Sequence, residues 1–181
     1  MNEIINSLEL KDIIKELKNK NYLTALNKTK SLNEKYPSDK ILIKIFASIY
    51  FNIGQWESAL KYYKILLNLD NEKFKILCNI GVSYFKLGKI NKSIKAFRDA
   101  IDDNPNFDLA YDNLGISYLE LGKFEDAIQN FVLSLNLNEK NYNSQKNLIN
   151  SLNLAKPKKK IDHVIIKLDN EISKIINNFN I

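Results

Sequence analysis

The sequence predicts an all-α protein, built as a tandem array of antiparallel helical hairpins with a capping helix at the carboxyl end. The chain repeats itself at a shift of 34 residues, and apolar residues recur at helical spacing within each repeat. Its 181 residues include only five Gly and three Pro. These leave little material for the turns and strand boundaries of an all-β fold, whereas long helices joined by short turns need few.

The repeat is visible in both halves of each unit. The first half carries an apolar residue, a small residue and then a tyrosine, and the second half carries a glycine, another small residue and an aromatic residue. The aligned sets are Phe46, Ile80, Leu114 and Leu148; Ala47, Gly81, Gly115 and Ile149; Tyr50, Tyr84 and Tyr118; Gly54, Gly88 and Gly122; Ala25, Ala59, Ser93 and Ala127; and Thr29, Tyr63, Phe97 and Phe131.

Each unit divides into two helices near the glycine column, because glycine can take the positive φ that ends one helix and turns the chain into the next. The small residues let helix backbones approach closely, and the aromatic residues fill the space between hairpins. No hairpin can bury its own apolar face, so neighbouring hairpins must stack. The repeat region is predicted over 1–155, with units at 6–39, 40–73, 74–107 and 108–141 and a fifth first helix at 142–155.

Both ends of the array depart from the pattern. In the first unit Asp12 and Glu16 occupy positions that are apolar elsewhere, and Lys20 replaces the turn glycine, as is common in a terminal repeat with one face in water. The periodicity stops at a basic linker over 156–160. An amphipathic helix over 161–181 is predicted to cap the last repeat. Insertion of this helix into a second copy, which would form a homo-oligomer, is the other interpretation.

The pattern resembles the tetratricopeptide repeat (TPR) family, in which Leu-Gly, Tyr, Ala, Phe and Pro recur at fixed spacing. The best copy is Leu114 and Gly115 followed by Tyr118, Ala127 and Phe131. The resemblance covers roughly residues 6–155. It implies an α-solenoid, a right-handed superhelix whose concave groove is lined by the first helix of each hairpin. It also implies a scaffold or adaptor that binds a protein or peptide in that groove, and no enzyme.

Composition narrows the function further. Cys78 is the only cysteine and His163 the only histidine, so neither an intramolecular disulfide nor a zinc site of several thiolates can form. No phosphate-binding loop is present, and we expect no cofactor, metal or catalysis. The net charge of +6 is nearly all lysine, with Arg98 the single arginine, which disfavours nucleic-acid binding. No apolar run approaches the roughly 20 residues of a membrane span, and without a signal-peptide pattern we expect a cytoplasmic protein.

One candidate peptide site is a row of amides on the first helices. Asn79, Asn113 and Asn147 stand 34 residues apart, with Ile45 at the matching position of the second unit. Amides both donate and accept, so such a row can hold the backbone of an extended peptide, although the row can also serve packing alone. The row resembles that of the sugar-transferase superhelices in this family.

The neighbouring columns are apolar beyond what stacking requires, and they can receive apolar side chains of a partner or pack against another part of the chain. A mixed column beside them also contains Cys78 and Lys146. The further candidates for peptide contact in these columns are Phe51, Val82, Phe85, Ile116, Leu119, Lys44 and Asp112.

Three alternatives bear on function. The branch of the family that clamps the carboxyl end of chaperones uses a set order of lysines, an arginine and asparagines; Lys44 and Asn79 match it, but Ser48, Leu109 and Asn113 do not. Lysine- and asparagine-rich arrays also resemble the recognition arms that precede glycosyltransferase, sulfotransferase or 2-oxoglutarate oxygenase domains. Finally, exposed end repeats can make a self-assembling structural array.

Overall fold

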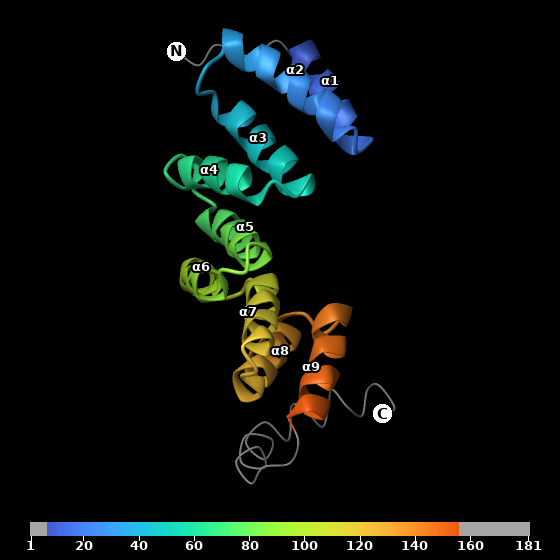
Figure 1. Cartoon of the computed structure of the whole chain (residues 1–181), viewed down its shortest axis with the longest axis vertical. Coiled ribbons are helices and arrows are strands. Elements are labelled where there is room, and N and C mark those ends of the chain that lie inside the picture. Colours follow the sequence, from blue (N-terminus) through green and yellow to red (C-terminus); the bar gives the residue numbers. More distant parts are fainter. Residues whose placement is uncertain (1–6, 156–181) are drawn as a thin grey trace. The chain divides into compact units, whose positions relative to one another are not determined.

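The computed structural model describes residues 7–155, which form an all-α array of helices (Figure 1). The predicted linker at 156–160 and the capping helix at 161–181 lie outside the described residues. The chain divides into two compact units, Met1–Leu87 and Gly88–Ile181.

Unit 1 contains two hairpins and the first helix of the third repeat. Its helices are α1 (Ser7–Lys18), α2 (Tyr22–Lys35), α3 (Lys40–Asn52), α4 (Trp56–Leu67) and α5 (Lys73–Lys86). Consecutive helices pack against each other throughout the unit.

Unit 2 contains the second helix of the third repeat, a complete hairpin and one further first helix. Its helices are α6 (Ile90–Asp103), α7 (Asp108–Glu120), α8 (Phe124–Leu137) and α9 (Tyr142–Leu154). The second helices of all four repeats begin 34 residues apart, at Tyr22, Trp56, Ile90 and Phe124. The starts of the second helices therefore keep the period of the sequence.

The turns between helices depend on residues with positive φ. Gly54, Gly88 and Gly122 have φ of 76°, 69° and 66°, which confirms the turn predicted at this column. Lys20 has φ 59° at the matching place in the first unit, so the turn survives there without glycine. In the last of these turns the N–H of Lys123 donates to the carbonyl of Tyr118 at 2.9 Å, which closes the end of α7.

The core of unit 1 is aliphatic at its centre and aromatic at its edge. Ile13, Leu42 and Ile49 are buried, and Tyr62 of α4 stacks on the rings of Phe46 and Tyr50 of α3 at 4.9 and 5.5 Å between centroids. Stacked aromatic pairs at this distance add to the stabilisation from buried area. Asp12 and Glu16, which replace apolar or aromatic residues in the degenerate first unit, form ion pairs: Lys28 contacts Asp12 at 2.7 Å and Glu16 at 3.0 Å.

The core of unit 2 depends on a close approach between α7 and α8. Phe131 of α8 is fully buried, and its ring lies against the backbone of α7 at Gly115. A Cβ added at Gly115 would stand 2.7 Å from Cε1 of Phe131, closer than atoms in contact can come. Glycine at this position therefore admits the ring.

Gly115→Ala is expected to destabilise the protein by about 1 to 3 kcal/mol, because the added methyl group forces the Phe131 ring or the helices apart. Urea denaturation followed by circular dichroism measures this change. The double variant Gly115→Ala, Phe131→Leu should cost less than the sum of the two single changes, since a smaller side chain relieves the clash. Additive costs would show that the two residues do not constrain each other.

Candidate peptide-binding surface

The backbone of the three candidate asparagines is tied to buried serines. In each case a serine hydroxyl one turn later donates to the asparagine carbonyl, and all three serines are fully buried. The bonds run from Ser83 to Asn79 at 2.8 Å, from Ser117 to Asn113 at 2.9 Å and from Ser151 to Asn147 at 2.6 Å. This serine column also keeps the 34-residue period, a signal that the sequence analysis missed.

Two of the asparagine side chains are held by bonds within unit 2. The amide of Asn113 donates to the carbonyl of Leu109 at 2.8 Å, and the amide of Asn147 forms a hydrogen bond with the carboxylate of Asp112. Asn79 on α5 of unit 1, like the other two, is half-buried. An internal bond fixes the orientation of each of the two amides in unit 2 before any partner arrives.

Asp112 lies deeper than a residue of an open groove, with only 6% of its surface exposed. The hydroxyl of Ser144 on α9 donates to its carboxylate at 2.7 Å, and Ser144 also contacts Ser134 of α8 at 2.9 Å. These bonds offset the cost of burying the carboxylate and link α7, α8 and α9. Asp112 was expected among the groove-lining residues; its position inside this network suits it to orient Asn147.

Burial raises the pKa of Asp112 above its usual 3.8. The hydrogen bonds from Ser144 and Asn147 oppose this rise, and the negative charge of Asp108 adds to it. Desolvation is the largest of these effects, so the folded protein binds the Asp112 proton more tightly than the unfolded chain does.

Lys44 lies on the exposed side of α3 in unit 1 and forms an ion pair with Asp70 at 2.5 Å. Lys40 approaches the same carboxylate at 3.5 Å, and the backbone N–H of Glu72 donates to it at 3.3 Å. The hydrogen bonds from Lys44 and Glu72 hold the pKa of Asp70 at about 2. The ammonium group of Lys44 therefore has a carboxylate partner within the chain.

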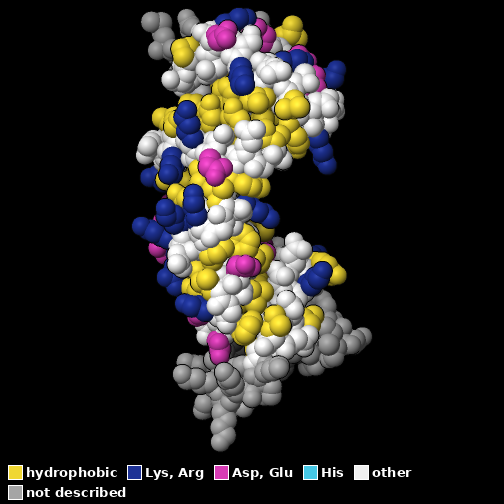
Figure 2. All heavy atoms as spheres, viewed as in Figure 1, with side chains coloured by type: hydrophobic (Ala, Val, Ile, Leu, Met, Phe, Trp, Pro, Cys, Tyr) yellow, Lys and Arg dark blue, Asp and Glu magenta, His cyan; other side chains and the backbone are white. Residues whose placement is uncertain are grey.

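The five apolar candidates are all half-buried, as expected for side chains that can still meet a partner. Phe51 contacts Trp56 edge to face at 5.4 Å and Tyr63 at 6.0 Å, which fixes its ring on hairpin α3/α4. Val82 and Phe85 lie on α5, and Ile116 and Leu119 on α7. Figure 2 shows that hydrophobic side chains gather on the viewed face of each unit.

Other kinds of site find no support between residues 7 and 155. No group of three or more His, Cys, Asp or Glu side chains in this range is arranged to hold a metal ion. None of the helices described in this range is long and apolar enough to cross a membrane.

Asp70→Asn is expected to lower the melting temperature at neutral pH, because the neutral side chain loses its ion pair with Lys44. A carboxylate with a lowered folded-state pKa stabilises the fold above its unfolded pKa near 3.8, and this stabilisation is lost as the pH falls towards 2. Thermal unfolding from pH 2 to 7 should therefore show a difference from the native chain that shrinks below about pH 4. Glu57→Gln removes the same charge at an exposed position and is the control. If Asp70→Asn changes the melting temperature at pH 7 no more than this control does, the prediction is wrong.

Asp112→Asn is expected to show the opposite dependence on pH. A raised folded-state pKa means that the native carboxyl loses stabilisation as the pH rises through that pKa, whereas asparagine does not titrate. The melting temperature of the variant, relative to that of the native chain, should therefore increase between about pH 3 and 7. Asp126→Asn on the exposed face of α8 is the control. If the difference in melting temperature between the variant and the native chain stays constant over this pH range, the raised pKa of Asp112 is refuted.

Comparison with known families identifies the repeat. A family model described as TPR repeat matches residues 47–88 and 83–122, and one described as Tetratricopeptide repeat matches residues 109–141. No curated protein sequence matches the chain significantly.

Solved structures share the fold at low sequence identity. The MamA RS-1 ArsTM double mutant is 15% identical, with a TM-score of 0.74 over 94% of this chain and 98% of that one. The first TPR domain of human RPAP3 is 22% identical, with a TM-score of 0.61 over 64% and 91%. The first TPR of Spaghetti (RPAP3) bound to the HSP90 peptide SRMEEVD is 21% identical, with a TM-score of 0.61 over 65% and 94%. On the matched repeats and the shared fold, the chain belongs to the tetratricopeptide repeat family.

Proposed function

We propose that the chain is a protein-interaction module that binds an extended peptide along its first helices. The observation that carries this proposal is the fixed orientation of the Asn113 and Asn147 amides in unit 2. A side chain held in its binding orientation loses less conformational entropy when a partner binds.

The two amides belong to neighbouring first helices. Helices α7 and α9 pack against each other, and the bond from Ser144 to Asp112 joins them directly. An amide offers two N–H donors and a carbonyl oxygen that accepts, so an amide that is bonded inside the protein can also bond to a peptide. Hydrogen bonds from such a pair to the backbone of a strand give affinity that is independent of the side chains of the peptide.

Selectivity would come from the apolar residues beside the amides. Ile116 and Leu119 on α7 are half-buried and follow Asn113 by three and six residues. A peptide with apolar residues at alternate positions would place them against these side chains while its backbone meets the amides.

Unit 1 carries an equivalent set on its own first helices. Asn79, Val82 and Phe85 lie on α5, and Phe51 lies on α3. Lys44 on α3 is held by Asp70, so an acidic group of a partner would have to share it. A similar protein, RPAP3, is seen with a bound HSP90 peptide, which supports the peptide class. Leu109 and Asn113 stand where chaperone-tail binders have basic residues, so we do not extend the proposal to that ligand.

Peptides selected from a random display library on the full chain provide the test. Asn113→Ala and Asn147→Ala are each expected to weaken binding of the selected peptides by roughly 1 to 3 kcal/mol, because a buried peptide hydrogen bond is lost. Isothermal titration calorimetry measures the loss.

Asn150→Ala is the matched control, because Asn150 is an exposed asparagine on the same helix as Asn147. It should leave the affinity unchanged. If all three alanine variants bind the peptides as the native chain does, or if all three lose the same affinity, the amides do not form the site. Phe85→Glu extends the test to unit 1 and should abolish binding there while helical content stays near that of the native chain.

A further inference from the structure

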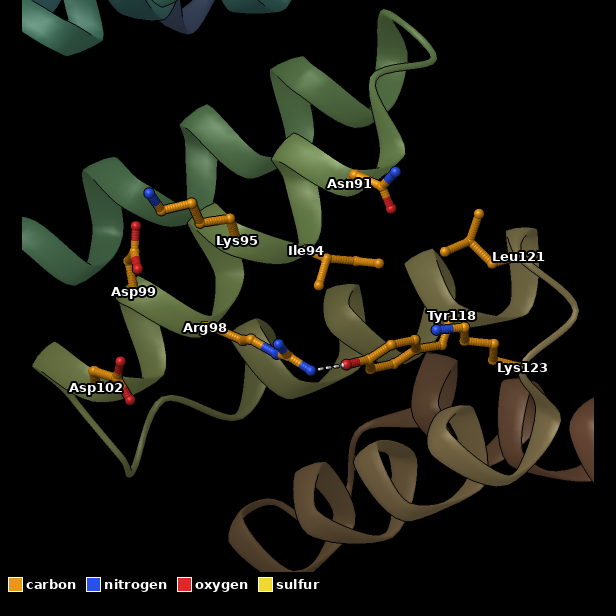
Figure 3. Close-up of a pocket in the computed structure, with 9 residues that line it drawn as sticks. All are labelled: Asn91, Ile94, Lys95, Arg98, Asp99, Asp102, Tyr118, Leu121 and Lys123. Atoms are coloured by element: carbon orange, nitrogen blue, oxygen red, sulfur yellow. Dashed lines mark hydrogen bonds between the residues drawn. The ribbon is translucent and has the colours of Figure 1, made fainter.

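A shallow trough of about 440 Å³ runs beside one face of α6 in unit 2 (Figure 3). Its charged side chains on α6 are Lys95, Arg98, Asp99 and Asp102, and Tyr118 of α7 stands on the opposite wall. Because these four charged residues recur at three, four and seven positions, they share one face of the helix. The face belongs to a second helix and is separate from the first-helix surfaces proposed to bind peptide.

The charged side chains along α6 stand in the order that is unfavourable for the helix dipole, with bases near its start and acids at its end. Exposed Lys89 directly precedes α6, exposed Lys92 and Lys95 lie in its amino-terminal half, and Asp102 and Asp103 lie in its last turn. A helix prefers acidic residues at its start and basic residues at its end, so this order is unfavourable for an isolated α6. Helix α8 has the preferred order at its start, with Glu125 and Asp126 in the first turn. The reversed order on α6 therefore needs a different explanation.

The same order of charges becomes favourable when this face of α6 packs against the same face of a second, antiparallel α6. Lys95 and Asp102 are equally distant from the point midway between Arg98 and Asp99, so rotation by 180° about that point exchanges bases for acids. We propose that the trough face of α6 binds the same face of a second copy of this chain, with the two helices antiparallel. Lys95 then lies opposite Asp102 of the second copy, and Arg98 opposite Asp99 of the second copy. Two-fold symmetry repeats each pair.

Arg98 is fixed at the centre of this face. Its Nη2 donates to the hydroxyl of Tyr118, and its guanidinium carbon lies 5.9 Å from the centre of that ring. Because Tyr118 is buried, its ring and hydroxyl hold the arginine side chain in a fixed position. A guanidinium has five N–H donors, and one bond to Tyr118 leaves capacity for a carboxylate from a second copy.

Within one copy, Lys95 and Asp99 stand four residues apart on this face of α6. Figure 3 shows Lys95 extended along α6 towards Asp99. A base that precedes an acid by four residues has the weaker orientation of such pairs. A second copy gives every base a further acid, and a network of charges contributes more than isolated exposed pairs do. One helix face falls below the roughly 1,200 Å² of a stable dimer, so this association is transient and sensitive to salt.

Sedimentation equilibrium of the full chain, from about 10 µM to about 1 mM, tests the proposal, since weak exposed pairs require high concentration. At roughly 20 mM salt the average mass should rise towards that of a dimer, and at roughly 500 mM salt the association constant should fall about tenfold. A chain that stays monomeric over the whole range at low salt overturns the proposal. So does an association that salt leaves unchanged.

Charge reversal shows whether α6 is the contact. Asp99→Lys with Asp102→Lys makes the face wholly basic, and Lys95→Glu with Arg98→Glu makes it wholly acidic. Each double variant alone should lose dimerisation, and an equimolar mixture of the two should regain it as a heterodimer. Asp126→Lys with Glu139→Lys, at exposed positions outside the trough, is the control for net charge and should dimerise almost as the native chain does.

Circular dichroism checks that each variant folds. The acidic variant loses the contact between Arg98 and Tyr118. If this loss unfolds it, the single variant Lys95→Glu takes its place in the mixture, since Lys95 has no contact with Tyr118 in Figure 3. Dimerisation of both double variants at the native level would place the contact elsewhere and overturn the proposal. Failure of the mixture to associate would do the same.

Discussion

The contact between a small residue in one helix and an aromatic ring in the next is the constraint on which the array depends. At Gly115 the helix α7 has no side chain, and the ring of Phe131 occupies the space where one would be. The close approach buries Ala127 and Ile128 of α8 as well. Once two helices are held at this distance, their turn, their crossing and the surface left for a partner are all restricted.

The sequence predicted this framework in detail because the period repeats each requirement three or four times. The glycine column predicted positive φ at Gly54, Gly88 and Gly122, and the second helices begin at four positions in strict register. Even the degenerate first unit keeps its turn, with Lys20 in the glycine conformation. Its unexpected charges, Asp12 and Glu16, are explained by Lys28, which lies on the next helix.

The polar contacts of the candidate surface were less predictable, because they join residues that belong to different repeats. Nothing in the column of Lys44 indicates that Asp70 will lie against it. The burial of Asp112 depends on Ser144, 32 positions later, at a place where the earlier repeats have Ala110 and Ile76. Periodicity predicts what all repeats share, whereas these bonds use residues that only one repeat has. The serine column was predictable in principle, since it keeps the period.

The edge-to-face contact between Phe51 and Trp56 has a practical consequence. Trp56 is the only tryptophan in the chain, and it lies in unit 1 on hairpin α3/α4. Its intrinsic fluorescence therefore reports the melting of that hairpin, while far-ultraviolet dichroism reports the helices of both units. Repeat arrays can lose cooperativity between neighbouring segments. The native chain thus carries a built-in spectroscopic probe of whether its two units unfold in one transition or in two.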